Sequence, residues 1–207
     1  MKVSTVWATP NGEALVAFMA RVSNPANQDV PETAPKLIQY LIKNKHWSPF
    51  EMVNIVMEIE TTRDIARQIL RHRSFSFQEF SQRYAEVSAF EYTGARLQDT
   101  KNRQNSLETE DEELKRWWVY TQHRVRNEAE FMYTAALKRG IAKEVARKLL
   151  PEGLTVSRMY MNGTLRSWLH YVSIRCDEAT QKEHRDVALL CKAELIKAFP
   201  SICEVLE

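Results

Sequence analysis

The sequence predicts one domain that mixes strands and helices and is mostly helical in its C-terminal half. Residues 52–61 alternate apolar and polar side chains, which is the pattern of a strand with one buried face. Residues 108–139 instead repeat apolar side chains at helical spacing, and acidic residues crowd their first turns. A chain of 207 residues has the size of a single domain with a proper core.

Four elements are expected in the N-terminal part of the chain. Apolar periodicity predicts a strand at residues 2–9, helices at 13–21 and 32–45, and the strand at 52–61. In the first helix, the side chains expected to face inward are Leu15, Val16, Phe18 and Met19. In the second strand, the buried side chains should be Val53, Ile55, Met57 and Ile59.

A further helix should follow the second strand directly and lead into residues 71–84. On a helical wheel its apolar face consists of Ile65, Ala66, Ile69 and Leu70. Its polar face consists of Asp64, Arg67, Gln68 and Arg71. If the helix continued to Arg73, that guanidinium would point away from Arg71 and onto the apolar face, where an unpaired charge is costly. Either the helix ends earlier, therefore, or Arg73 meets an anionic or polar partner.

The rest of the chain is predicted to be largely helical. After a strand at 90–96 and a polar connection at 98–106, the expected elements are a long helix at 108–139, a short helix at 141–150, a strand at 154–161 and helices at 163–175 and 180–199. The apolar face of the long helix should comprise Leu114, Trp118, Val125, Ala129, Met132 and Ala136. In the helix at 163–175, Arg166, His170 and Ser173 share one side and Arg175 projects from the opposite flank, which suggests two different ligands.

Composition excludes several classes of protein. The chain has 29 Lys and Arg against 27 Asp and Glu, and a net charge of +2 gives no reason to expect nucleic acid as a partner. Three cysteines without paired spacing argue against a disulfide framework, and neither they nor the histidines have the spacing of a metal site. No apolar run reaches the roughly 18 residues that span a bilayer, and no signal peptide begins the chain. A cytoplasmic protein that binds neither membrane nor metal is expected.

Residues 71–84 carry the clearest sign of function. They read RHRSFSFQEFSQRY and combine three arginines, a histidine and a glutamate with serines and three phenylalanines. Arginine binds phosphate in a bidentate manner and aromatic rings accept stacking, so the stretch suits an anionic ligand with a flat ring, such as a nucleotide. The sequence contains no glycine-rich phosphate loop, so arginine side chains would have to hold the phosphate.

Two other interpretations remain open at this point. A nucleotide-binding or single-stranded nucleic-acid-binding module would use the same arginines for phosphate contact and the same phenylalanines for base stacking. A cysteine-dependent pyrimidine methyltransferase would need a nucleophile among Cys176, Cys191 and Cys203. None of these cysteines stands beside a histidine in the sequence.

The stretch closely resembles a family signature. The pattern R-H-R-x-x-S-x-Q-E-x-S-x-R-Y is similar to R-H-R-x-x-S-x-N-E-x-S-x-R-Y of the flavin-dependent thymidylate synthases, and Gln78 replaces the Asn. The resemblance extends along most of the chain, through residues 20–23, 46–51, 68, 146–151, 166–170, 175, 181 and 183. Ser48 stands where the family often has Thr, and Thr164 where some members have Asn.

The resemblance implies that residues 1–207 form a single flavin-dependent thymidylate synthase domain. Such an enzyme methylates dUMP to dTMP, with methylene-tetrahydrofolate as carbon donor, FAD as hydride carrier and NADPH as reductant. It also implies an α+β fold, in which helices flank a mainly antiparallel sheet, and a homotetramer with each flavin held between subunits.

Carried over position by position, the resemblance assigns two sets of residues. The expected FAD set is Ser23, Ser48, Glu51, Arg71, His72, Arg73, Glu79, Thr164, Arg166 and His170. The expected dUMP set is Gln68, Arg71, Glu79, Phe80, Ser81, Gln82, Arg83, Arg147 and Arg175.

Chemistry distributes roles among the dUMP set. Arg83 and Arg147 suit the phosphate. Arg175 is expected to be the catalytic residue, because a cation beside the pyrimidine favours negative charge on the ring and makes C5 a nucleophile. Ser81 is expected to hydrogen-bond the nucleotide, because no general base is evident beside it. This mechanism needs no cysteine.

Overall fold

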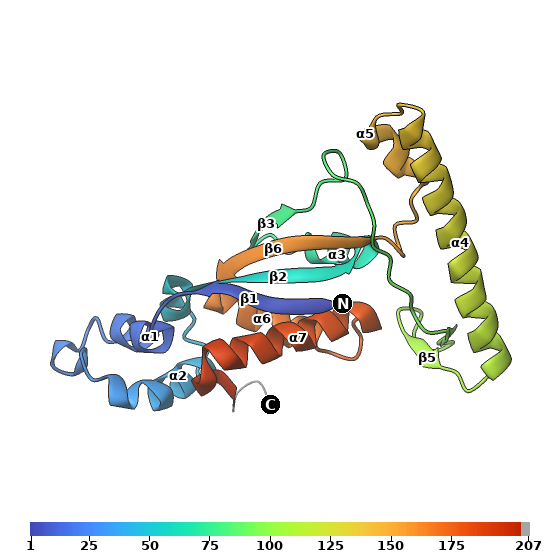
Figure 1. The fold of residues 1–207 in the computed structure, drawn as a ribbon. Coiled ribbons are helices and arrows are strands. Elements are labelled where there is room, and N and C mark those ends of the chain that lie inside the picture. The colour runs from blue at the N-terminus through green and yellow to red at the C-terminus, as the bar shows by residue number, and fades with distance from the viewer. Residues whose placement is uncertain (204–207) are drawn as a thin grey trace.

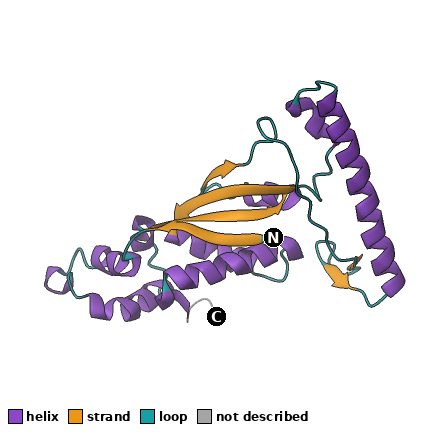
Figure 2. Cartoon of the chain, in the orientation of Figure 1, coloured by secondary structure: helices purple, strands orange, loops and turns teal. Residues whose placement is uncertain are grey.

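Four strands form the central sheet of the computed structural model, which describes residues 1–203 (Figures 1 and 2). Their order is β1-β2-β6-β3 and each neighbouring pair is antiparallel. The strands are β1 (Lys2–Ala8), β2 (Asn54–Thr62), β3 (Ser76–Glu79) and β6 (Val156–Thr164). A separate hairpin consists of β4 (Arg96–Gln98) and β5 (Ser106–Glu108). The expected α+β class with a mainly antiparallel sheet is confirmed.

Helices surround the sheet and account for most of the remaining chain. They are α1 (Gly12–Ala20), α2 (Ala34–Lys43), α3 (Arg63–Ile69), α4 (Glu112–Lys138), α5 (Lys143–Ala146), α6 (Leu165–Arg175) and α7 (Lys182–Ala198). Short 3-10 helices are η1 (Pro25–Asn27), η2 (Pro31–Thr33), η3 (Ser48–Met52), η4 (Arg147–Leu149) and η5 (Pro200–Ile202). In Figure 1, α6 and α7 lie along one side of the sheet, and α1 and α2 gather at one of its ends.

The core lies between the sheet and the helices on that side. In β2, Ile55, Met57 and Ile59 are fully buried, as their alternation predicted. In β6, the buried Met159 and Met161 alternate with exposed polar residues. One face of the sheet therefore carries the core, while the other is not covered by described helices of this chain.

Two expectations for the N-terminal half are corrected. In α1, Val16 is buried, but Phe18 and Met19 are 37% and 38% exposed, although they were expected to face inward. The buried stripe of α1 follows Gly12 and Val16, which lie one turn apart, and Phe18 falls on the opposite side. In α3 the helix ends at Ile69, so the alternative in which it stops before Arg73 is confirmed. The directions of Arg71 and Arg73 are consequently set by a turn, and the helical wheel does not apply to them.

The predicted strand at residues 90–96 is largely absent. Phe90 makes only an isolated bridge with Thr155, and β4 begins at Arg96. Side chains of α4 take the backbone groups that a strand would use: Trp118 Nε1 donates to the Thr93 carbonyl at 3.0 Å, and Gln122 donates to the same carbonyl and accepts from the Thr93 N–H. The polar connection expected at 98–106 is the loop of the β4–β5 hairpin.

The long helix α4 stands apart from the sheet (Figure 1). Asp111 caps it by accepting hydrogen bonds from the backbone N–H groups of Glu113 and Leu114, at 3.0 and 2.9 Å. Of its expected apolar face, Val125 and Met132 are 47% and 45% exposed. The helix was predicted correctly, but this chain alone does not bury its apolar stripe.

Phe75 anchors the turn between α3 and β3 against the core. Its ring packs edge-on against Trp168 and Tyr171 of α6, with centroids 4.9 and 6.0 Å apart. The ring also covers Gly163 in β6, where a Cβ atom would stand 2.5 Å from Phe75 Cε1. Only glycine at this position lets the ring approach so closely.

Replacing Gly163 with alanine should destabilise the fold by about 1–3 kcal/mol, because the new methyl group would occupy space that the Phe75 ring fills. The matched control is Gly153→Ala, since a Cβ there has open space within 4 Å. Its effect should stay within about 0.5 kcal/mol. Urea unfolding of both variants measures the difference, and equal stabilities would contradict this account of the anchor.

Candidate functional site

The turn between α3 and β3 brings His72 against the C-terminal end of α6. Arg175 donates from Nε to His72 Nε2 at 2.9 Å, and the Tyr171 ring stands edge-on to the imidazole, with 5.0 Å between centroids. Burial, together with the charges of Arg175 and His170, lowers the pKa of His72 to about 4. His72 is therefore neutral near pH 7, accepts from Arg175 and holds that guanidinium in place.

This contact joins the two predicted residue sets. The helical wheel of α6 separates Arg175 from Arg166 and His170, and the structure keeps the latter two on the outer side of the helix. The side chain of Arg175, which belongs to the dUMP set, nevertheless contacts the FAD set, because it donates a hydrogen bond to His72. The two expected ligands would therefore meet at this pair.

A second group of predicted residues meets where η3 lies beside the start of α6. Thr164 Oγ1 donates to Glu51 Oε2 at 2.7 Å and accepts from the Ser167 N–H at 3.2 Å, so Thr164 also caps α6. Arg166 Nε lies 3.7 Å from Glu51 Oε1. The structure thus brings together Glu51, Thr164 and Arg166, all of the FAD set. Ser48 begins η3 and is exposed there.

Gln68 of the dUMP set is held from α7. Its Nε2 donates to Gln181 Oε1 at 2.7 Å, and its Oε1 lies 3.3 Å from His184 Nδ1. His184 is fully buried and also contacts the hydroxyl of Tyr171 at 3.2 Å. Sequence reasoning assigned no role to His184 or Tyr171, because both occupy core-facing helix positions and belong to no motif. Their only sequence signal is the nearness of His184 to Gln181.

Glu79, placed in both sets, is neutralised from inside the fold. Its Oε1 accepts from Ser157 Oγ at 2.7 Å and from Arg63 at 3.4 Å, and Arg67 lies 3.8 Å from its Oε2. Arg63 is buried, and burial lowers its pKa despite the attraction of Glu79. Arg147 is near enough to repel Arg63. Glu79 therefore links β3 to α3.

The turn after β3 carries the remainder of the signature. The Phe80 N–H donates to the Arg158 carbonyl at 2.8 Å, and the Ser81 carbonyl accepts from the Tyr84 N–H at 3.1 Å. Gln82 is buried, and its Nε2 has no hydrogen-bond partner in the described part of the chain. Phe80 and Ser81 are half-buried.

Both arginines expected to bind phosphate lie near this turn. Arg83 is exposed and its guanidinium carbon lies 5.3 Å from the centre of the Tyr84 ring. Lys143 of α5 donates to the Tyr84 carbonyl at 3.3 Å. Because η4 follows α5 directly, this contact brings the segment that carries Arg147 beside the turn.

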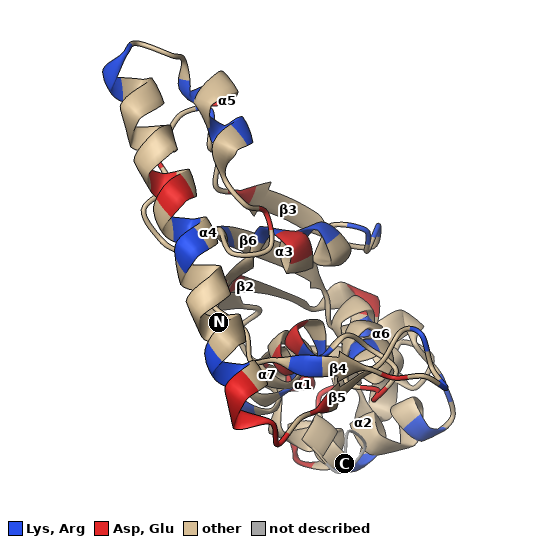
Figure 3. Ribbon diagram, turned by 90° about the vertical axis from the view of Figure 1, so that its right-hand side faces the viewer, with Lys and Arg blue, Asp and Glu red and all other residues tan. Residues whose placement is uncertain are grey.

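The arginines of the two sets differ from the structural ones in their charge balance. Arg63, Arg67 and Arg96 each pair with a glutamate. Within residues 1–203, five predicted ligand-binding arginines have no salt-bridge partner: Arg71, Arg73, Arg83, Arg147 and Arg175. Basic and acidic residues are otherwise interspersed along the ribbon (Figure 3). This local excess of positive charge is suited to anionic ligands.

The two residue sets extend towards opposite ends of the sheet. β2 and β6 pair from Asn54 with Thr164 to Thr62 with Val156, a distance of about 26 Å at the usual strand rise. Thr164 and Glu51 lie at one end, and Arg63 follows β2 at the other. Ser23, beyond α1, is exposed. One chain therefore does not gather every predicted residue into one cavity.

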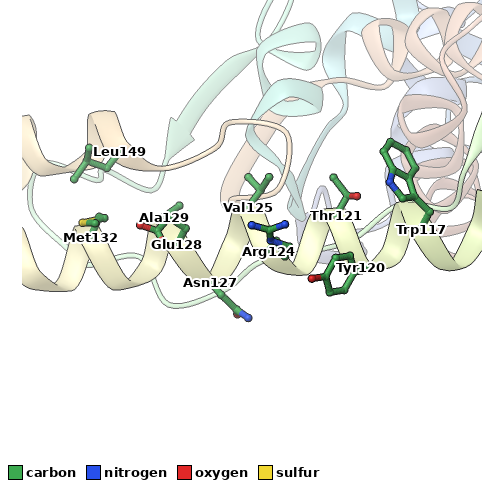
Figure 4. Close-up of a pocket in the computed structure, with 10 residues that line it drawn as sticks. All are labelled: Trp117, Tyr120, Thr121, Arg124, Val125, Asn127, Glu128, Ala129, Met132 and Leu149. Carbon is green, nitrogen blue, oxygen red and sulfur yellow. The ribbon is translucent and has the colours of Figure 1, made fainter.

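A large hollow lies elsewhere, along α4. It measures about 930 Å³ and is open to solvent. Ten residues line it, nine from α4 and one from η4: Trp117, Tyr120, Thr121, Arg124, Val125, Asn127, Glu128, Ala129, Met132 and Leu149 (Figure 4). Its lining is a helix face, with none of the predicted ligand-binding residues.

Cys176 and Cys191 do not have the properties of a nucleophile. Cys191 is buried, and burial raises its pKa far above the ordinary value; burial also raises the pKa of Cys176. In residues 1–203, no cluster of histidine, cysteine, aspartate or glutamate side chains could hold a metal ion. None of the described helices is long and apolar enough to cross a membrane.

The family model described as thymidylate synthase complementing protein matches residues 5–201. A flavin-dependent thymidylate synthase of Synechocystis sp. is 53% identical over 195 residues, covering 94% of this chain and 89% of that protein. A probable flavin-dependent thymidylate synthase of Paramecium bursaria Chlorella virus 1 is 50% identical over 196 residues, covering 94% and 90%.

A solved structure extends the likeness to the whole fold. It is the UMP/dUMP methylase PolB from Streptomyces cacaoi bound with 5-Br dUMP, which is 28% identical and superimposes with a TM-score of 0.86. The match covers 98% of this chain and 93% of that one.

The buried histidines predict how stability depends on pH. Burial lowers the pKa of His184 to about 3 and that of His72 to about 4, from an ordinary value of 6.5. At a pH between these lowered pKa values and 6.5, the unfolded chain binds more protons than the folded chain. The free energy of unfolding should therefore fall as pH drops below about 6.5. The slope should approach about 1.4 kcal/mol per pH unit for each histidine.

Urea unfolding between pH 7 and pH 5 measures this dependence, and His184→Leu isolates one contribution to it. The variant should show a shallower slope, because its share of the proton uptake is gone. An equal slope in both proteins would contradict burial of His184 in its neutral form.

Proposed function

Because the chain belongs to the family of thymidylate synthase complementing proteins, the flavin-dependent thymidylate synthases, we propose that it methylates dUMP to dTMP. Methylene-tetrahydrofolate supplies the carbon, and FAD and NADPH supply the reducing equivalents. The observation that carries the proposal is the contact between His72 and Arg175, together with the predicted ligand-binding arginines that have no salt-bridge partner within residues 1–203.

The side chains of the dUMP set have separate tasks. Arg83 and Arg147 hold the phosphate through charge-assisted hydrogen bonds. Arg175, aligned by neutral His72 at 2.9 Å, keeps its two terminal nitrogens for the pyrimidine. Its positive charge stabilises negative charge on the ring, so that C5 attacks the one-carbon unit without an enzyme nucleophile. The raised pKa of Cys176 and Cys191 agrees with a mechanism that does not use a thiolate.

The donor set near η3 and α6 fits a flavin nucleotide. Thr164, Arg166 and His170 offer a hydroxyl, a guanidinium and an exposed imidazole, and Arg73 adds a cation that has no salt-bridge partner within residues 1–203. A dinucleotide with a pyrophosphate needs such donors. When bound, FAD supplies hydride chemistry, and the protein supplies position and charge. Three cysteines without paired spacing support the further proposal of a reducing, cytoplasmic setting.

The experiment is a crossed pair of substitutions. Purified protein should show flavin absorbance and oxidise NADPH in a manner that depends on dUMP and methylene-tetrahydrofolate. Arg175→Ala should lower dTMP formation by about 10²–10³-fold, because it removes a charge-stabilising group, while FAD content stays unchanged. His170→Ala should instead lower FAD content.

Two results would contradict this assignment. Protein that stays colourless after reconstitution with FAD would reject the flavin enzyme. Equal loss of FAD in both variants would reject the separate roles of Arg175 and His170.

We further propose a homotetramer that uses α4 as part of its interface. Large apolar side chains of this helix are exposed in the single chain: Trp117, Val119, Tyr120, Val125, Phe131 and Met132. Exposed apolar surface of this extent marks an interaction site. The division of the predicted ligand residues between two ends of the sheet supports a site completed by a second copy.

Val125→Glu should shift the protein from a tetramer to smaller species, because the groove along α4 would then have to bury an unpaired carboxylate. Val125→Thr is the control, since it keeps the shape of the side chain and adds no charge. Light scattering after size exclusion gives the mass of each. A tetramer that persists in the Glu variant would exclude this helix face from the interface.

A further inference from the structure

Six side chains form an unbroken series of hydrogen bonds that includes Gln68. In order, they are Arg96, Glu183, Gln181, Gln68, His184 and Tyr171. After the Arg96–Glu183 contact, the successive distances are 3.0, 2.7, 3.3 and 3.2 Å. The series begins in the β4–β5 hairpin, passes through the start of α7 and reaches α3 and α6.

The direction of the first hydrogen bonds follows from the chemistry of Arg96 and Glu183. A guanidinium only donates and a carboxylate only accepts. Burial raises the pKa of Glu183, but hydrogen bonds from Arg96 and Gln181 outweigh this effect and leave the pKa lowered, so the group is ionised. Gln181 must therefore turn its NH₂ group towards Glu183, at 3.0 Å, and its carbonyl towards Gln68.

The orientation of Gln181 also fixes the orientations of Gln68 and His184. Gln68 has to donate from Nε2 to the Gln181 carbonyl, so its own Oε1 faces His184 Nδ1. The single hydrogen of the neutral imidazole then lies on Nδ1, and Nε2 accepts from the Tyr171 hydroxyl. Each amide and the imidazole thus has one permitted orientation.

We propose that this series is a positioning device that fixes the Gln68 amide and lets the site prefer a uracil base over a cytosine base. The inference rests on the proposed function, in which Gln68 contacts dUMP. Gln68 keeps one N–H hydrogen and one carbonyl lone pair for a ligand. Uracil accepts a hydrogen bond at its exocyclic O4 and donates one from N3, whereas cytosine donates from its exocyclic amine and accepts at N3. An amide of fixed orientation can therefore complement one base better than the other.

Glu183→Gln tests the device from a distance, because this residue is two steps removed from Gln68. The new amide can accept from Arg96 and donate to Gln181, which permits both glutamines and the imidazole to reverse, so that His184 Nε2 donates to the Tyr171 oxygen. Calorimetric titration of the flavin-loaded protein with dUMP and with dCMP gives the two Kd values. In the variant, the ratio of the dCMP Kd to the dUMP Kd should fall by about tenfold.

Glu194→Gln is the matched control, because it makes the same change on the same helix at a residue bonded to Thr5. It should leave the ratio at the wild-type value. His184→Leu provides a second variant, which removes the donor to Gln68 and should also lower the ratio.

The outcomes separate the inference from the proposed function. Wild-type protein that does not bind dUMP would overturn both. Wild-type protein that binds and discriminates, with unchanged ratios in Glu183→Gln and His184→Leu, would overturn the positioning device alone. A loss of dUMP affinity matched by an equal loss for dCMP would also overturn it, since general damage to the fold would affect both nucleotides alike.

Discussion

The seating of Phe75 over Gly163 is the contact on which the arrangement of the site depends. The ring lies between β6 and α6, and it fixes the turn in which α3 ends and β3 begins. His72 belongs to that turn, so its approach to Arg175 is set by the same packing. A hydrophobic contact at the edge of the core therefore determines where the polar groups stand. Close packing tolerates little change of volume at such a position.

Sequence reasoning recovered what depends on local pattern. The alternation in β2 gave its buried face, whereas the roles that the signature assigns to Arg71, His72 and Glu79 stay a prediction. The cost of burying Arg73 left two alternatives, and the structure shows the one in which α3 ends before Arg73. The failures share a cause, which is contact between distant segments. The backbone of Thr93 forms hydrogen bonds with side chains of α4 in place of a neighbouring strand. His184 contacts Gln68, which is 116 residues away in the sequence. No periodicity within one segment contains such information.

The presence or absence of a glutamate partner separates the arginines that stabilise this fold from those proposed to bind ligands. Glu79 and Glu152 neutralise Arg63 and Arg67 from within the chain, which allows Arg63 to be buried. The arginines of the turn and of η4 receive no such carboxylate from residues 1–203, which leaves their charge available for the proposed ligands. The same residue type thus serves two purposes, and only the placement of glutamates, which the three-dimensional structure supplies, tells them apart.

The uncovered apolar stripe of α4 has a thermodynamic consequence. A helix whose large side chains, such as Phe131, remain in water gains much of its stability only when another chain covers them. In the proposed tetramer, folding and association are linked equilibria, and the apparent stability of the protein would rise with its own concentration by mass action. Thermal midpoints measured for this chain have meaning only together with the protein concentration at which they were recorded.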